Sequence, residues 1–212
     1  MKKLLAICTC MLMILAMAAC ENATPSISSP AVSSGEDSAQ NDSKSETKLS
    51  DKLSDAQIQI NGDIYTVPCT FQDFFDNGWT AKEDVENREA AHLSGGSVAM
   101  ENGDSYLVVS FSNTSGEKKM AADCPIDQIS INAEYNPNTE MMMPGGITFG
   151  VGIEDLKTAY GEPDDEYLGS YYTQLTYELI GDPGSMVAQN YILFTVYDND
   201  GLVGIDLNRT QE

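Results

Sequence analysis

The residue of this chain best placed for a defined chemical reaction is Cys20. Two lysines, Lys2 and Lys3, precede an apolar run from Leu4 to Ala19, and Cys20 follows it directly. A positive start, a short apolar stretch and small residues before the cut are typical of a secretory signal peptide. The run is too short, and too closely followed by polar sequence, for a transmembrane helix.

The ending Met17-Ala18-Ala19-Cys20 indicates a lipoprotein signal more specifically. We expect cleavage after Ala19, a diacylglyceryl group on the Cys20 thiol and acylation of the new amino terminus by a fatty acid such as palmitate. Two acyl chains suffice for stable anchoring, because each buried methylene contributes roughly 0.8 kcal/mol. The alternative is an ordinary signal peptide with an incidental cysteine.

Two further cysteines belong to the exported part of the chain. Cys8 and Cys10 leave with the signal peptide, so Cys69 and Cys124 remain. Two thiols in an oxidising compartment favour one disulfide, which would close a loop of about 56 residues and stabilise the fold by roughly 4 kcal/mol. The alternative is a pair of buried free thiols.

The sequence gives little support for catalysis or for a metal cofactor. His92 is the sole histidine, and the polar stretch 86–96 around it predicts a solvated loop, so we expect no Ser-His or Cys-His pair. One histidine and two distant cysteines do not make zinc-ligand spacing. The chain has 33 acidic residues, so some carboxylates must lie close together by chance, and their proximity does not indicate a glycosidase.

Two other motifs have structural interpretations that we prefer. The sequence Asp198-Asn199-Asp200-Gly201 resembles the opening of a calcium loop, but its glycine comes two residues early and Arg209 stands where the bidentate Glu should be. We predict a hairpin turn there. The run Met141-Met142-Met143 could suggest copper(I), yet adjacent methionines point in different directions, which favours an apolar plug.

The charge of the chain excludes one class of partner. The formal net charge is −22, and removal of residues 1–19 deletes two lysines and no acid, which leaves about −24. Nucleic-acid binding depends on Lys and Arg that neutralise phosphates, so we expect no nucleic acid as a partner. The same charge opposes contact with an anionic bilayer, so the lipid on Cys20 would be the membrane contact.

The chain divides into four segments. Residues 1–19 are the signal peptide, and residues 20–54 are rich in Ser, Thr, Asn, Asp, Glu and Lys, too poor in apolar residues to order themselves. We expect them to form a lipidated, disordered tether. Residues 55–140 and 141–212 are then the two halves of a folded region large enough for one substantial core.

Strand patterns dominate this folded region. Alternating residues surround Asn61-Gly62, a strong hairpin signal, and a second hairpin surrounds Asn102-Gly103-Asp104. Predicted strands cover 57–60, 64–67, 97–101, 105–112, 126–132, 173–180, 190–198 and 202–208. Two short helices are expected. One spans 71–76 with Thr70 as its N-cap, and the other spans 153–160 with Gly161 just past its end.

The two halves repeat one pattern: a short strand, a cap, a short helix, a glycine stop and three antiparallel strands. Thr70-Phe71-Gln72-Asp73-Phe74 matches Gly152-Ile153-Glu154-Asp155-Leu156. We therefore predict an α+β fold of two tandem repeats, each a short helix packed on antiparallel β-sheet.

Several motifs carry a resemblance to known families. They are Gly145-Gly146-Ile147-Thr148-Phe149-Gly150, Glu154-Asp155-Leu156 and Tyr160-Gly161-Glu162-Pro163-Asp164. This stretch resembles the repeat unit of β-lactamase-inhibitor-protein-like domains and of the small lipoprotein subunit of the outer-membrane β-barrel assembly machine. It departs from that pattern at the cap, where Gly152 replaces the usual Ser or Thr.

The upstream half, with Asn61-Gly62, Val67-Pro68, Phe74 and Asn77-Gly78-Trp79, resembles uncharacterised lipoproteins of gut Firmicutes. Together the resemblances cover about residues 57–208. They imply a sheet with short helices on one face and an open, slightly concave face that binds proteins. They imply nothing about chemistry, because their glycines, prolines and apolar residues serve turns and packing.

The predicted strands indicate where such a face would lie. Alternation places Leu107, Val109, Phe111, Ile192, Phe194 and Val196 toward the core. If helices cover only that side, Tyr106, Tyr191, Leu193 and Tyr197 form a tyrosine-rich patch ringed by acids, which is the composition of a protein-binding site. The alternative is that the other half or a loop buries both faces.

We therefore expect a non-enzymatic binding module, anchored to the cell membrane by lipid and facing outside the cytoplasm, with no cofactor and no metal. Its partner would be another protein or a cell-wall component. The alternatives are an inhibitor or adaptor of a secreted enzyme and a hydrolase of envelope polymer. A hydrolase would need a deep cleft with carboxylates of perturbed pKa, whereas a binder needs a broad aromatic surface.

Overall fold

The computed structural model describes residues 48–179 and 190–210 of the chain. These residues belong to one unit, Ser45–Glu212. The predicted signal peptide, Cys20, most of the predicted tether and the turn at 181–184 lie outside the described residues. None of the helices in the described part is long and apolar enough to cross a membrane.

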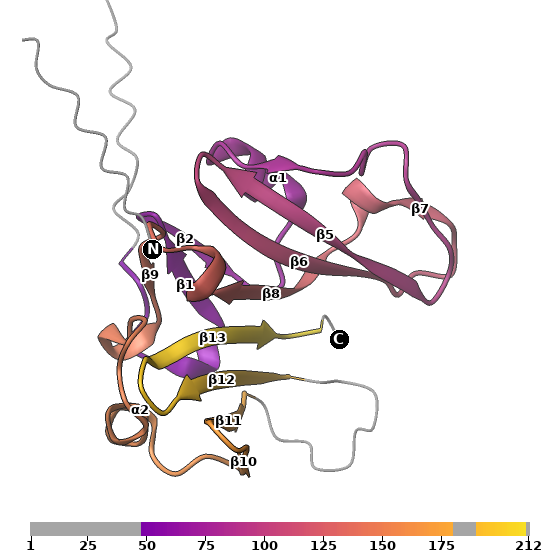
Figure 1. The fold of residues 1–212 in the computed structure, drawn as a ribbon. Coiled ribbons are helices and arrows are strands. Elements are labelled where there is room, and N and C mark those ends of the chain that lie inside the picture. Colours follow the sequence, from indigo (N-terminus) through magenta and orange to yellow (C-terminus); the bar gives the residue numbers. More distant parts are fainter. Residues whose placement is uncertain (1–47, 180–189, 211–212) are drawn as a thin grey trace, which may run out of the picture. The chain divides into compact units, whose positions relative to one another are not determined.

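Antiparallel strands dominate this part of the chain (Figure 1). The largest sheet has eight strands in the order β10-β11-β12-β13-β8-β6-β5-β3. Their bounds are β3 (Thr80–Ala81), β5 (Ser94–Asn102), β6 (Ser105–Asn113), β8 (Ile126–Asn132), β10 (Asp165–Leu168), β11 (Tyr172–Glu178), β12 (Tyr191–Tyr197) and β13 (Gly201–Asn208).

Two smaller sheets accompany it. The first contains β1 (Gln57–Ile60), β2 (Asp63–Thr66) and β9 (Met141–Met142), in the order β2-β1-β9. The second pairs β4 (Glu89–Ala90) with β7 (Lys119–Met120). In the β1–β2 turn, Asn61 and Gly62 both have positive φ, at 52° and 90°, as the predicted tight hairpin requires.

The described part contains two α-helices, α1 (Phe71–Asp76) and α2 (Ile153–Tyr160). The Thr70 hydroxyl accepts a hydrogen bond from the Asp73 backbone N–H, and the Asp73 carboxylate accepts one from the Thr70 N–H, so α1 begins with a capping box. At α2 the Gly152 N–H donates to Asp155 at 3.0 Å. Single turns of 3₁₀-helix occur at η1 (Leu53–Asp55), η2 (Ala121–Asp123), η3 (Ala133–Tyr135) and η4 (Pro144–Gly146).

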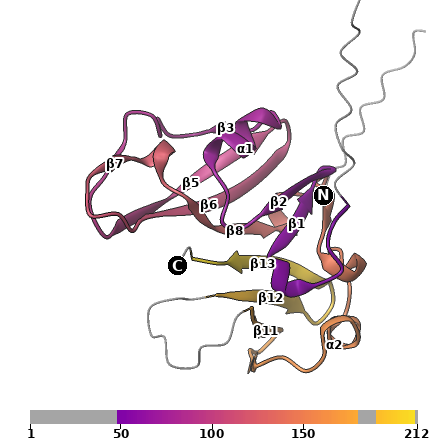
Figure 2. The same cartoon turned by 180° about the vertical axis from the view of Figure 1, so that it is seen from behind.

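Both helices pack on the same face of the large sheet. Phe71 of α1 meets Phe111 of β6 edge to face at 5.9 Å, and Tyr160 of α2 stacks on Phe194 of β12 at 5.7 Å. Figure 2 shows α1 beside β5 and β6 and α2 beside β11 and β12. Alternate residues of β6 and β12 are buried on this side, and the residues between them are half-buried on the other. The helices thus cover one face, and the second is called the open face below.

The architecture is α+β and rich in sheet, as the sequence predicted. Both helices lie where the patterns placed them, and so do the two asparagine-glycine hairpins and β8. The in-and-out alternation of β6 and β12 also agrees with the prediction.

The differences concern short or weakly patterned strands. β5 begins at Ser94, three residues earlier than predicted, because Gly95 and Gly96 have no side chains to show an alternation. A Cβ on Gly95 would lie 2.2 Å from the Phe111 carbonyl oxygen, so the close strand pairing requires glycine there. The acidic strand β10 was missed because all four of its residues are exposed. Ordered contacts also start before residue 55, since the Ser50 N–H donates to the Gln57 side chain at 2.8 Å.

Candidate functional site

The open face is defined by the register of the strands. Tyr106, Val108 and Ser110 face this side of β6, and the next strands continue the same rows with mostly polar or aromatic side chains. One row crosses the sheet from Val108 through Ser130, Asp206, Leu193 and Thr176 to Asp165. Because directly paired residues lie on the same side of a sheet, all of these side chains share the open face.

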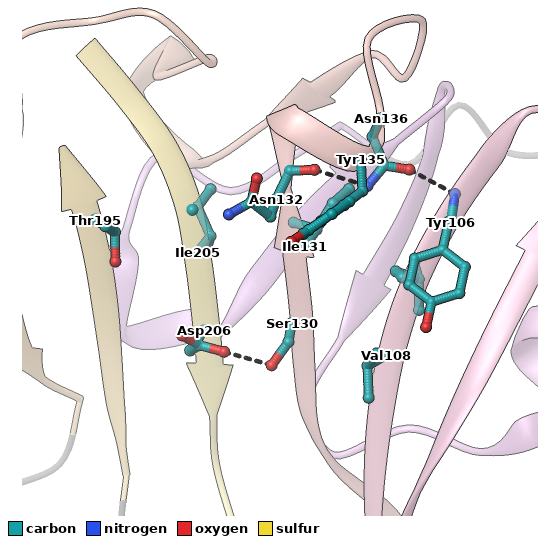
Figure 3. A pocket seen from close by; sticks show the side chains of 12 residues that line it. Tyr106, Val108, Ser130, Ile131, Asn132, Tyr135, Asn136, Thr195, Ile205 and Asp206 are labelled. Carbon is teal, nitrogen blue, oxygen red and sulfur yellow. Dashed lines mark hydrogen bonds between the residues drawn. The ribbon is translucent and has the colours of Figure 1, made fainter. Parts of the chain in front are cut away.

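A groove of about 620 Å³ crosses the middle of this face. Its floor comes from β6, β8, β12 and β13, and the turn η3 forms one end. Figure 3 shows the Tyr135 side chain between those of Asn132 and Tyr106, with Ser130 and Asp206 farther along the strands. The groove is lined by Tyr106, Leu107, Val108, Ser130, Ile131, Asn132, Tyr135, Asn136, Thr195, Gly204, Ile205 and Asp206. Its walls are therefore apolar and aromatic, with a few polar groups.

Hydrogen bonds fix the turn that carries Tyr135. The Asn132 side chain accepts a hydrogen bond from the Glu134 N–H at 2.8 Å, which caps η3. The buried side chain of Asn136 donates to the Asn132 carbonyl at 2.8 Å and accepts from the Tyr106 N–H. Tyr135 is nevertheless 70% exposed. A rigid turn thus presents an aromatic ring to solvent beside the groove.

Four further tyrosines form what we call the tyrosine cluster: Tyr167, Tyr171, Tyr172 and Tyr197. Tyr172 contacts Tyr167 and Tyr171 with ring centroids 6.0 and 5.6 Å apart, and Tyr197 lies 6.3 Å from Tyr171 and 6.4 Å from Tyr172. Tyr167 and Tyr171 are 55% and 65% exposed. These rings pack mainly on one another and present a continuous aromatic surface.

The tyrosine cluster adjoins the groove. Thr195, which lines the groove, is two residues from Tyr197 on the same side of β12. The neighbouring carboxylate of Glu134 raises the pKa of Tyr197 above its ordinary value, with smaller contributions from burial, Tyr171, Tyr135 and Asp200. The groove and the cluster therefore form one surface in a negative electrostatic environment.

The four residues predicted as a binding patch all lie on the open face and are half-buried. They are not one contiguous patch. Tyr106 lies three strands from β12, roughly 14 Å away, and Tyr191 is six residues from Tyr197, roughly 20 Å along the strand. Tyr106 lines the groove, and Tyr197 belongs to the tyrosine cluster. Leu193 lies in the row that contains Asp206, and Tyr191 lies opposite Asn208 in the next row of the open face.

The sequence interpretation missed Tyr135, Tyr167, Tyr171 and Tyr172. The strand predicted from Thr173 begins at Tyr172, one residue earlier, and an alternation extended by that one residue would have found Tyr172 on the open face. Tyr167 is on the unpredicted strand β10 and Tyr135 is on a 3₁₀ turn. Neither position has a periodic signal.

Cys69 and Cys124 are free thiols in the structure, so the predicted disulfide is not formed in it. They nevertheless line the same surface pocket, because Cys69 exchanges two backbone hydrogen bonds with Ile126, two residues after Cys124. Burial raises the pKa of Cys69 to about 12 and also raises that of Cys124. This arrangement corresponds to the alternative of two free thiols, although Cys69 is only half-buried.

The other candidate motifs have structural roles. His92 is exposed, and its Nδ1 contacts the Ser115 carbonyl oxygen. Asp198, Asn199 and Asp200 form the turn between β12 and β13, as predicted. Met141 and Met143 are buried and Met142 is 39% exposed, in keeping with an apolar plug. Within residues 48–179 and 190–210, no group of three His, Cys, Asp or Glu side chains could hold a metal ion.

The carboxyl group of Asp127 can be compared with that of a hydrolase site, because its pKa is perturbed. Burial raises the pKa of Asp127 above its ordinary value. Asp127 borders a shallow pocket of about 350 Å³ that is lined otherwise by glycine, serine, phenylalanine, amide and threonine residues. No second carboxylate is among the described residues that line this pocket, so it lacks the carboxylate pair of a glycosidase.

No protein-family model matches the chain, and neither a curated protein nor a solved structure matches it.

Proposed function

We propose that this protein is a non-catalytic binding module that recognises a partner protein through the open face of its large sheet. The observation that carries the proposal is the continuous surface formed by the groove, Tyr135 and the tyrosine cluster. Tyrosine is enriched at protein interfaces because its ring buries a large area while its hydroxyl stays hydrated. A contiguous exposed patch of aromatic rings on a folded domain is typical of an interaction site.

The backbone beneath this surface supports the same proposal. The rings project from paired strands and from a capped turn, so few degrees of freedom are lost when a partner binds. A preorganised, shallow aromatic surface suits a protein partner better than a hydrolase substrate, which would require converging catalytic groups. An inhibitor or adaptor of a secreted enzyme would use the same surface and would differ only in its target.

We also propose that the two halves are tandem repeats. In each half a helix precedes four strands of the large sheet, α1 before β3, β5, β6 and β8 and α2 before β10, β11, β12 and β13, while the first half also contains the separate pair β4 and β7. In the sheet the halves meet through their last strands, β8 and β13, so the second half follows the first in mirrored order. This symmetry of connection, together with the matching helix motifs, supports the resemblance to β-lactamase-inhibitor-protein-like domains.

The proposed location rests on the amino-terminal motif. The module would be held on the outer side of the cell membrane by lipid on Cys20, and the Ser-rich tether would keep the open face accessible. Metabolic labelling with a palmitate analogue tests this directly. The parent chain should take up label and a Cys20→Ala chain should not. Equal labelling of the two chains would contradict the lipid anchor.

Affinity capture from detergent-solubilised envelope tests the binding function. The bait is the full chain with a carboxyl-terminal tag, compared with a Tyr171→Ser/Tyr197→Ser variant. Leu93→Ser is the matched control, because Leu93 is 75% exposed at the start of the β5 region and outside the aromatic surface. A protein captured by the parent and by the control, and lost from the double variant, is expected. Capture that is equal in all three chains would refute a role for the tyrosine cluster.

A further inference from the structure

The strands of the open face contain no cationic side chain. None of β6, β8, β10, β11, β12 and β13 includes Lys, Arg or His. Carboxylates are present instead: Asp165, Glu178 and Asp206 lie on this face, and Glu134 and Asp200 lie next to Tyr197. Lys82, which pairs with Glu101 opposite Tyr106, lies at the β5 edge of this face, so the face that carries the exposed aromatic rings is predominantly negative.

These carboxylates have no cationic partner within the described part of the chain. The ion pairs among residues 48–179 and 190–210 use other acids, such as Glu101 with Lys82 and Glu162 and Glu166 with Lys157. Among the described residues these pairs leave the carboxylates named above without a cation, and the whole chain carries a net charge of −22. An anionic partner, including a second copy of this chain, would be repelled.

The groove has the chemistry that a long cationic side chain requires. Tyr106 and Val108 form an apolar wall of the groove, and the Asp206 carboxylate lies farther along the strands. One carboxylate oxygen of Asp206 accepts hydrogen bonds from Ser130 and from Gln128, which fixes the group in place. The methylene stem of Lys or Arg could follow the wall while its head group pairs with Asp206.

The tyrosine cluster suits the same ligand. A cation above a tyrosine ring within about 6 Å is attracted by the ring quadrupole, by roughly 0.5–2 kcal/mol according to its desolvation. Here four rings lie together and one of them, Tyr197, lies near Glu134 and Asp200, so the quadrupole and the carboxylates attract the same charge. A neutral polymer could stack on the rings but would form no ion pair with the carboxylates.

We propose that the open face binds a lysine- or arginine-rich segment of a protein partner, with cationic side chains in the groove at Asp206 and on the tyrosine cluster. This inference rests on the proposed binding function and specifies its partner. Long-range attraction to the negative face would speed association, and pairing at fixed carboxylates would supply specificity.

The test measures binding of a fluorescent decalysine peptide to the full-length protein in neutral detergent at low salt. Asp206→Asn and Glu134→Gln each remove one charge from the open face with little change of shape. Glu154→Gln is the matched control, because Glu154 is an exposed residue in the first turn of α2, the helix packed on the opposite face. It changes the net charge equally. Thermal unfolding verifies that each variant is folded.

We expect Asp206→Asn and Glu134→Gln to weaken binding by about tenfold each, and the control by less than about twofold. Tyr171→Ser/Tyr197→Ser should weaken it comparably, and added salt should weaken binding to the parent chain. Equal effects of all three charge variants would show diffuse attraction and overturn the proposal, as would tighter binding of a neutral Gly-Ser peptide. An envelope protein captured through the tyrosines but insensitive to Asp206→Asn and Glu134→Gln would leave the binding function standing and overturn the cationic partner.

Discussion

Gly201, the first residue of β13, packs against residues 150–151, which lead into α2. Its replacement by alanine should be strongly destabilising. Its φ is +71°, a region that costs an L-residue about 1–2 kcal/mol. A Cβ there would also lie 2.3 Å from the carbonyl oxygen of Gly150 and 2.5 Å from its carbonyl carbon. Because the obstruction is backbone, no rotation of a side chain can relieve it.

The segment 150–151 would therefore have to move. Two hydrogen bonds hold it, from the Gly150 N–H to the Leu202 carbonyl at 2.9 Å and from the Leu202 N–H to the Val151 carbonyl at 2.8 Å. Each contributes about 1 kcal/mol. Together with the φ cost, Gly201→Ala should lower the free energy of unfolding by about 3–4 kcal/mol and the melting temperature by roughly 6–16 °C.

Gly103 provides the matched control. It has a φ of +60° in the β5–β6 turn, and nothing lies within 4 Å of a Cβ built on it. Gly103→Ala should lower the free energy of unfolding only by the conformational cost of a positive φ, about 1–2 kcal/mol. Urea unfolding, followed by the fluorescence of the single tryptophan, Trp79, would measure both variants. Equal losses would refute the reasoning, because they would mean that the contact with Gly150 adds nothing.

Three further predictions concern the cap, a buried acid and a buried thiol. Thr70→Ala removes the acceptor of the Asp73 N–H and should cost about 1 kcal/mol in urea unfolding, whereas Thr70→Ser should cost less than about half of that; equal losses would contradict a capping role. Burial raises the pKa of Asp127 in the folded state, so its contribution to stability is fully present below the unfolded pKa and is lost as pH rises through the folded pKa. Asp127→Asn should therefore gain stability relative to the parent between acidic and neutral pH, measured by unfolding over a pH series, and a gap that stays constant with pH would refute this. Burial raises the pKa of Cys69 to about 12, so at pH 8 its alkylation in the native protein, followed by mass spectrometry, should be slower than in urea by a factor on the order of 10³. Rates within tenfold of each other would contradict a buried, protonated thiol.

The elements that the sequence predicted well share a local physical signal. Helix α1 has a capping box and a glycine stop, and the β1–β2 turn has the asparagine and glycine that its positive φ values require. β6 and β12 alternate because one face meets a core and the other does not. In each case the residues nearby in the chain determine the structure.

The elements that it missed are determined by distant residues. β10 has no buried side and is a strand because it pairs with β11 at the edge of the sheet. Cys69 and Cys124 lie by one pocket because the segment of Cys69 pairs with Ile126, yet proximity in a pocket does not make a bond. The tyrosine cluster joins β10, β11 and β12, whose rings come together only when the register is set.

The groove is formed jointly by the two halves of the folded region. Its floor combines β6 and β8 from the first half with β12 and β13 from the second, so it lies across the pairing of β8 with β13. That pairing aligns Ser130 with Asp206, the contact that fixes the carboxylate in the groove. A shift of one residue would turn Asp206 toward the core and bring Leu207 to the open face, because side chains alternate with a period of two. The sequence pattern of each half predicts the elements of that half separately, whereas the register between their last strands decides whether the groove exists.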